Sequence, residues 1–231
     1  MSARGVVTGL LVAGVVVGAG AVAADFWVAD KTEDTAVERI EQELEGVIGT
    51  PSVDVGGFPF LTQVASGSID EITAHVAGAT LGGIAATDID LAATGVTTRE
   101  PYMAAHATVS ATIAADQIQK VVVERTGLDV TVTSTNGALK VSGKVLGITL
   151  AASLEPRVVD GKLLADVTGV SLGGVGVDPS DLPGSIGDKV QGIEIPIEGL
   201  PADLVLTDAR VIDAGVRVTV AGDDVDLTDE S

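Results

Sequence analysis

Side chains able to do acid–base or metal chemistry are scarce in this chain. It has two histidines, His75 and His106, and no cysteine. Each histidine lies where apolar and polar residues alternate as they do along a strand. A lone strand histidine is more often a surface or core residue than a general base, which also needs a positioned partner. The absence of cysteine excludes disulfides and thiolate metal sites.

Two groups of carboxylates are also close in sequence. Asp88 and Asp90 alternate along one face of a predicted strand, where paired carboxylates usually face solvent. Four further aspartates lie within residues 223–229 and suggest calcium. They lack the glycine and the terminal glutamate spacing of an EF-hand loop, so a solvated tail is the better interpretation.

The familiar catalytic motifs are missing. The sequence has no Gly-x-Ser-x-Gly elbow, no phosphate-cradling P-loop, and no Gly-x-Gly-x-x-Gly that follows a strand and opens a helix. With so few nucleophiles and bases, we expect a binding protein rather than an enzyme, without a metal or a cofactor. A hydrolase that uses His75 or His106 is the enzymatic alternative.

Composition favours strands and limits the partners. Hydrophobic residues make up 46% of the chain but aromatics only 2%, so small aliphatics carry the apolar content. The formal net charge of −20 repels phosphate backbones, and nucleic-acid binding is therefore not expected. It also argues against docking onto anionic membranes by broad charge attraction. Any lipid contact is expected to be apolar and local.

Two of the five aromatic residues sit together in residues 56–61, which we call the aromatic turn. Two glycines open it and allow unusual backbone angles, while Pro59 fixes its own φ and holds Phe58 extended. The result is a rigid apolar wedge. Phe58 and Phe60 either plug the end of a core or form a lip of a pocket for an apolar ligand, and the sequence leaves both open.

The N-terminal segment is predicted to direct export. Residues 5–24 contain no charge, and a helix of that length spans roughly 30 Å, the thickness of a bilayer core. Arg4 precedes it and Asp25 follows it, which leaves the N-terminus in the cytoplasm. The segment is either a cleaved signal peptide or a retained anchor. We expect residues 25–48 to form an amphipathic helix, ended by Gly49 and Pro51.

Alternation then predicts strands at residues 67–76, 84–96 and 104–113, with a break at Asp70-Glu71. A helical period replaces it at residues 114–125, where Ile118, Val121 and Val122 share one face. The apolar side of this helix must cover a sheet.

From Leu128 onward the pattern is mainly strand. Asn136-Gly137 and Asp160-Gly161 predict two hairpins, and apolar residues from Leu146 to Leu154 all point one way. Short strands follow at 193–197, 204–206 and 216–220. Residues 223–231 hold five acids and are expected to fray.

Together these features resemble the LmeA-like phospholipid-binding proteins of the actinobacterial cell envelope. The most specific part of the resemblance is the run Pro51-x-Val53-x-Val55-x-Gly57-Phe58-Pro59-Phe60-Leu61-Thr62-Gln63, followed by Gly67 at the start of a strand. The closing pattern from Gly215 to Leu227 agrees with it. The resemblance implies an α+β fold like the tubular lipid-binding fold, in which a long curved antiparallel sheet wraps a helix and leaves an apolar groove.

The resemblance also implies a function and a place. The expected protein binds or transfers phospholipid, of the phosphatidylinositol type, and supports lipomannan and lipoarabinomannan elongation or maintenance. It would act on the periplasmic side of the plasma membrane, anchored or released. We expect residues 1–24 to be the signal or anchor, 25–222 the lipid-binding domain and 223–231 an acidic tail.

The residues expected to line the groove are apolar ones from two segments. They are Phe58, Phe60 and Leu61 on one wall and Ile118, Val121 and Val122 on the helical face opposite. The alternative is a non-catalytic interaction module with a filled core, which docks an envelope glycosyltransferase.

Overall fold

The computed structural model describes residues 36–38, 40–41, 44–81, 83–126, 129–135, 137–145, 148–177, 193–195 and 203–227. The predicted export segment at residues 1–24 lies outside this range, as do Leu146 and Asp229. Within the described residues, no helix has both the length and the apolar character needed to cross a membrane.

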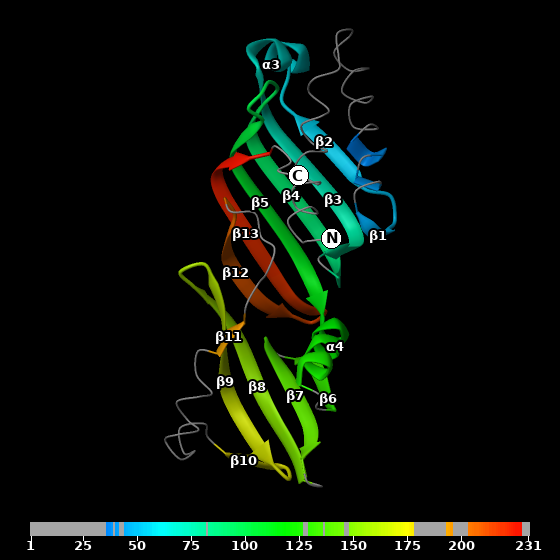
Figure 1. Cartoon of the computed structure of the whole chain (residues 1–231), viewed down its shortest axis with the longest axis vertical. Helices are drawn as coiled ribbons and strands as arrows, with labels where there is room; N and C mark the ends of the chain where they lie inside the picture. The colour runs from blue at the N-terminus through cyan, green and yellow to red at the C-terminus, as the bar shows by residue number, and fades with distance from the viewer. Residues whose placement is uncertain are drawn as a thin grey trace. The chain divides into compact units, whose positions relative to one another are not determined.

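The chain forms two compact units. The first contains Met1–Ala111, Glu198–Val205 and Thr219–Ser231, and the second contains Thr112–Ile197 and Leu206–Val218. Nearly all regular structure is antiparallel strand (Figure 1). The strands form a seven-stranded sheet and a six-stranded sheet, with two short helices, α3 (Phe60–Ser66) and α4 (Ala115–Thr126), among the described elements.

The seven-stranded sheet has the order β1-β3-β4-β5-β13-β12, and β2 also pairs with β3. Its strands are β1 (Glu45–Ile48), β2 (Ser52–Gly56), β3 (Ser68–Leu81), β4 (Ile84–Thr97), β5 (Met103–Ala114), β12 (Val205–Ile212) and β13 (Gly215–Asp226). The three long central strands β3, β4 and β5 lie side by side in Figure 1.

Alternation places the core of the first unit on one face of this sheet. On β3 the side chains of Ile69, Ile72 and Val76 are each at most 2% exposed. The predicted break is confirmed, because Asp70 and Glu71 are both exposed between buried isoleucines. The alternation resets on both strands together, because Ile69 pairs with Val96 and Ile72 with Ala93 in one continuous register, and all four side chains are buried.

The predicted helix over residues 25–48 is wrong at its C-terminal end. Residues 36–38 and 40–41 are helical, but Glu45–Ile48 is strand β1, paired antiparallel with β3. Gly46 has a φ of +65°, a left-handed conformation that a helix cannot continue through. The chain then gains backbone hydrogen bonds along the edge of β3 instead.

The six-stranded sheet has the order β10-β9-β8-β7-β6, and β11 also pairs with β9. Its strands are β6 (Val130–Thr135), β7 (Ala138–Val145), β8 (Ile148–Val159), β9 (Lys162–Leu172), β10 (Val175–Val177) and β11 (Ile193–Ile195). The predicted Asp160-Gly161 hairpin is confirmed, since both residues have positive φ angles, 51° and 73°, as its two-residue turn requires.

The expected fraying of the C-terminus is wrong for residues 223–227. Strand β13 continues to Asp226, and Val225 and Leu227 are buried at 0% and 1% exposure. The Leu227 N–H donates to the Tyr102 carbonyl at 2.8 Å. Asp223, Asp224 and Asp226 are exposed, whereas the two buried aliphatics hold this segment on the sheet.

The fold is therefore mostly β, with two antiparallel sheets where one long curved sheet around a helix was expected. The helix predicted at residues 114–125 is confirmed as α4. Helix α3 was not predicted, because its seven residues are too few to show a helical period.

Candidate lipid-binding site

The aromatic turn connects β2 to α3 within the first unit. Gly57 has a φ of +93°, and a Cβ atom there would lie 2.3 Å from the Gln63 Nε2. Only glycine fits this position without moving its neighbour. The Phe58–Pro59 peptide is cis, and Phe60 begins helix α3 directly after it.

The side chain of Gln63 holds the turn closed. It is 7% exposed, its Nε2 donates to the Gly56 carbonyl at 3.3 Å, and its Oε1 accepts from the Asp70 N–H at 2.7 Å. One buried amide thus joins the end of β2, helix α3 and the start of β3. Both bonds hold these segments together around the turn, so Gln63 helps to fix the direction in which the neighbouring aromatics point.

The turn separates its two phenylalanines. Phe60 is 4% exposed and is part of the core, whereas Phe58 is 77% exposed and Leu61 is partly buried. Phe60 therefore lies as the core-plug hypothesis expects. Phe58 lies at the surface, where the lip hypothesis would need it. The predicted role of Phe60 in a groove wall stays a prediction.

Helix α4 packs against the six-stranded sheet in the second unit. Ile118 contacts a buried cluster of Val132, Leu139 and Val216, together with partly buried neighbours that include Leu154. The Gln119 Oε1 also accepts the Val132 N–H at 3.0 Å, which ties the helix to the edge strand β6. The expectation that this helix covers a sheet is confirmed.

The other two helix positions differ from Ile118. Val122 is partly buried, and the side chain of Val121 lies outside what the structure describes. The six expected groove residues thus divide between the units: Phe58, Phe60 and Leu61 in the first, Ile118, Val121 and Val122 in the second.

The face of the six-stranded sheet toward α4 is apolar, and we call it the apolar face. Cross-strand pairing places Val132, Val141, Ala152 and Val170 in one row across β6, β7, β8 and β9. Val132 is buried under α4, but the other three are only partly buried. Ala152 is the shortest side chain in the row, so the row is lowest at its centre.

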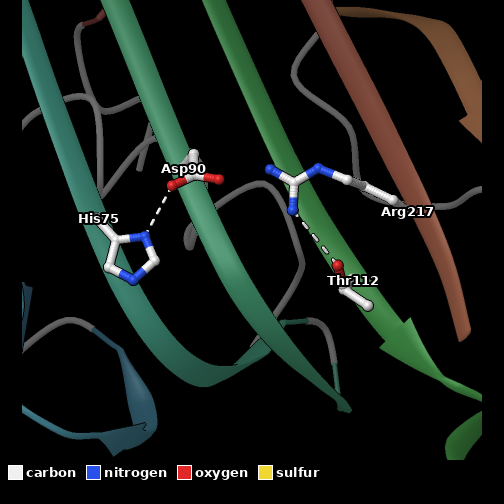
Figure 2. Close-up of polar contacts among 4 residues, drawn as sticks. All are labelled: His75, Asp90, Thr112 and Arg217. Carbon is white, nitrogen blue, oxygen red and sulfur yellow. Dashed lines mark hydrogen bonds and ion pairs between the residues drawn. The ribbon is translucent and has the colours of Figure 1, made fainter. Parts of the chain in front are cut away.

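The two histidines form surface pairs on the first unit. The His75 Nδ1 lies 2.7 Å from the Asp90 Oδ1, across β3 and β4 (Figure 2). The His106 Nδ1 lies 2.5 Å from the Asp223 Oδ1. All four side chains are about half exposed or more. Exposed cross-strand pairs of this kind add only ~0.2–1 kcal/mol.

One cation of the second unit is partly buried. The Arg217 Nη1 donates to the Oγ1 of Thr112, which is 0% exposed, at a long 3.4 Å (Figure 2). Among the described residues, no group of three or more histidine, aspartate or glutamate side chains is placed to hold a metal ion.

Sequence reasoning missed two features that matter for a site. Gln63 gave no signal, since its role depends on the turn that brings β2 beside β3. The apolar face was predicted in part, because Ala152 belongs to the run of apolar residues up to Leu154 that were expected to share one face of a strand. Which neighbouring strands complete the row depends on register alone.

The sequence matches one known protein family over most of its length. The model of the LmeA-like phospholipid-binding family matches residues 23–221, which is most of the chain. Searches of curated proteins and of solved structures found no match. On the extent of the family match, this chain belongs to the LmeA-like phospholipid-binding family.

Proposed function

We propose that the protein is a non-catalytic phospholipid-binding or lipid-transfer protein of the cell envelope. In this proposal it supports the elongation or maintenance of lipomannan and lipoarabinomannan. Residues 1–24 direct export, and the folded units act on the periplasmic side of the plasma membrane. Family membership supports the binding of phospholipid. The role in lipomannan synthesis and the location in the envelope are inferred from the resemblance.

The observation that carries the proposal is the incomplete burial of the apolar face. Val141, Ala152 and Val170 adjoin one another across three strands, yet none is fully buried in the described structure. Apolar side chains that adjoin one another and stay partly exposed leave surface that another apolar molecule could cover. An acyl chain would gain ~0.8 kcal/mol for each CH₂ group it buries there.

Small side chains suit this role. A row of valines around Ala152 is smooth and shallow, and it binds a flexible chain without requiring one headgroup. Val122 on α4 is partly buried and is our candidate for the helical wall. Phe58 and Leu61 in the first unit are the candidates for the lip.

The test is the lipid that the protein carries. The full chain, purified without detergent from an actinobacterial host, would be extracted with organic solvent and analysed by mass spectrometry. We expect about one phospholipid per protein. Ala152→Glu should remove most of it, because a carboxylate on the apolar face loses its hydration when an acyl chain covers it.

Thr131→Glu is the matched control, since this exposed residue on β6 projects from the face opposite to its neighbour Val132 and does not lie in the apolar row. It should keep the lipid. If both variants retain lipid, the apolar face is not the site. A lipid-free wild-type protein, even after incubation with phosphatidylinositol vesicles, would favour the module that docks an envelope glycosyltransferase.

A further inference from the structure

The face of the six-stranded sheet opposite the apolar face, which we call the polar face, contains a hollow. Its volume is about 360 Å³, and it opens over the middle of β7, β8 and β9. The lining residues that belong to the polar face are Lys140, Ala151, Ser153, Gly169 and Ser171, and Ala152 and Val170, which alternate with them and project from the apolar face, complete the lining. Two serine hydroxyls and one lysine therefore border a space that no large side chain fills.

Register explains why the hollow lies on this face. Ser153 pairs with Lys140 on one side and with Gly169 on the other, and Ala151 pairs with Ser171. Directly paired residues project from the same side of a sheet. The register of β8 and β9 also shifts between Ser153 and Leu154, an irregularity beside the hollow. Bulges are common next to binding sites because they redirect side chains.

The segment that forms β6 to β10 differs in charge from the rest of the chain. Residues 130–177 contain four basic residues, Lys140, Lys144, Arg157 and Lys162, and three acidic ones, Glu155, Asp160 and Asp166. The segment therefore carries a net charge of +1, and the rest of the chain carries −21. Strong local asymmetry of this kind orients a protein in an electric field.

Lysine is the cation at the hollow itself. Arg157 is engaged by Asp166, with the Nε and Oδ2 atoms 2.5 Å apart, whereas Lys140 is exposed and borders the hollow. A lysine ammonium beside two hydroxyls can donate several hydrogen bonds to a phosphate group. The small side chains of Ala151 and Gly169 leave room for it.

We infer that the polar face, centred on this hollow, binds the phosphate headgroups of anionic phospholipids at a bilayer surface. This rests on the proposed lipid function, and it adds the surface through which the protein meets the membrane. The acidic remainder of the chain is repelled by the same surface, so the polar face is the part of the sheet expected to meet it. The attraction between this face and the phosphate groups acts over a separation of about one Debye length, which is ~8 Å at physiological salt.

The experiment is vesicle co-sedimentation of the full chain. Binding is measured to vesicles that contain phosphatidylcholine and phosphatidylglycerol, and separately to vesicles of pure phosphatidylcholine. The ratio of the first value to the second cancels any contribution from apolar contacts. We expect a ratio well above one that falls as salt rises. Lys140→Glu should lower the ratio on the order of twentyfold, since each unit of charge near an anionic surface changes binding about fivefold.

Lys120→Glu is the matched control, because this exposed lysine on α4 undergoes the same change of charge away from the hollow. It should change the ratio far less than Lys140→Glu. Equal losses in both variants would show that total charge alone matters and would overturn the inference, as would a ratio near one for the wild-type protein.

Ala151→Leu tests the hollow without changing charge, and Ser171→Val is the second variant if the first misfolds. Either should lower the ratio severalfold by filling the space. A ratio unchanged by a folded filling variant would overturn the hollow as the headgroup site. Co-purified lipid is measured on the same samples, so loss of headgroup attraction with lipid retained separates this inference from the proposed acyl site.

Discussion

The seven-stranded and six-stranded sheets use the same alternation of small aliphatic residues, yet they bury it differently. In the first, Ile72, Ile89 and Val96 are at most 2% exposed. In the second, Val141, Ala152 and Leu154 stay partly exposed on the apolar face. The difference teaches that alternation marks an apolar face but does not say what covers it.

Charge follows the same division. The segment that forms β6 to β10 is nearly neutral, whereas acidic residues dominate the rest of the chain. A closed core with an acidic surface suits a soluble scaffold. A partly open apolar face backed by a nearly neutral polar face suits contact with a lipid on one side and a membrane surface on the other.

The largest expected effect comes from truncating matched aliphatic residues in the two sheets. Ile72→Ala should lower the free energy of unfolding by about 2–5 kcal/mol, because it opens a cavity in a fully buried site. Leu154→Ala should cost about 1–2 kcal/mol, since its partly exposed side chain loses less burial. Urea titration measures both. Equal losses would mean that the apolar face is as closed as the core.

A smaller effect is expected from matched glycine substitutions. A Cβ at Gly222 would lie 2.0 Å from the backbone oxygen of Asp203, so Gly222→Ala should destabilise by about 1–3 kcal/mol. At Gly169 the nearest atom is the Ser153 Oγ at 3.8 Å, an ordinary contact. Gly169→Ala should therefore stay within ~0.5 kcal/mol. Thermal unfolding of the two variants would show the difference, and a reversed order would contradict it.

The smallest effect on stability is expected at Phe58, which tests whether the first unit also contacts lipid. Phe58→Ser should change the free energy of unfolding by less than ~0.5 kcal/mol, because the ring is 77% exposed. If Phe58 is a lip, the same variant should slow phospholipid transfer between vesicles severalfold. Ile48→Ser, at a site that is 61% exposed, is the control and should leave transfer unchanged.

Much of the fold was predictable because local pattern and tertiary environment agree. Ile89 and Leu91 alternate with aspartates and are buried as expected, and the helical period at residues 114–125 became α4. Where they disagree, prediction failed. The end of the predicted helix at residues 25–48 is strand β1 instead, because Gly46 has a left-handed backbone and the edge of β3 offers hydrogen bonds. The acidic segment at residues 223–227 stays on the sheet because Val225 and Leu227 are buried.

The orientation of the two phenylalanines in the aromatic turn could not be predicted from the sequence. Phe58 and Phe60 are two residues apart in one apolar motif, yet one is exposed and the other buried. Their orientation depends on Gln63, which bonds to residues on β2 and β3 that lie on either side of α3. No pattern in the neighbouring residues reports such a contact.

By itself, the sequence determined that this is a β-rich, acidic protein with scarce catalytic groups and membership in a phospholipid-binding family. These properties follow from composition, period and motif, which are local and additive. Only the tertiary structure decided that the strands form two sheets, that the row through Ala152 is partly open, and that Lys140 borders a hollow. The physical reason is that pairing register joins residues from separate strands, and a shift of one residue would exchange the two faces.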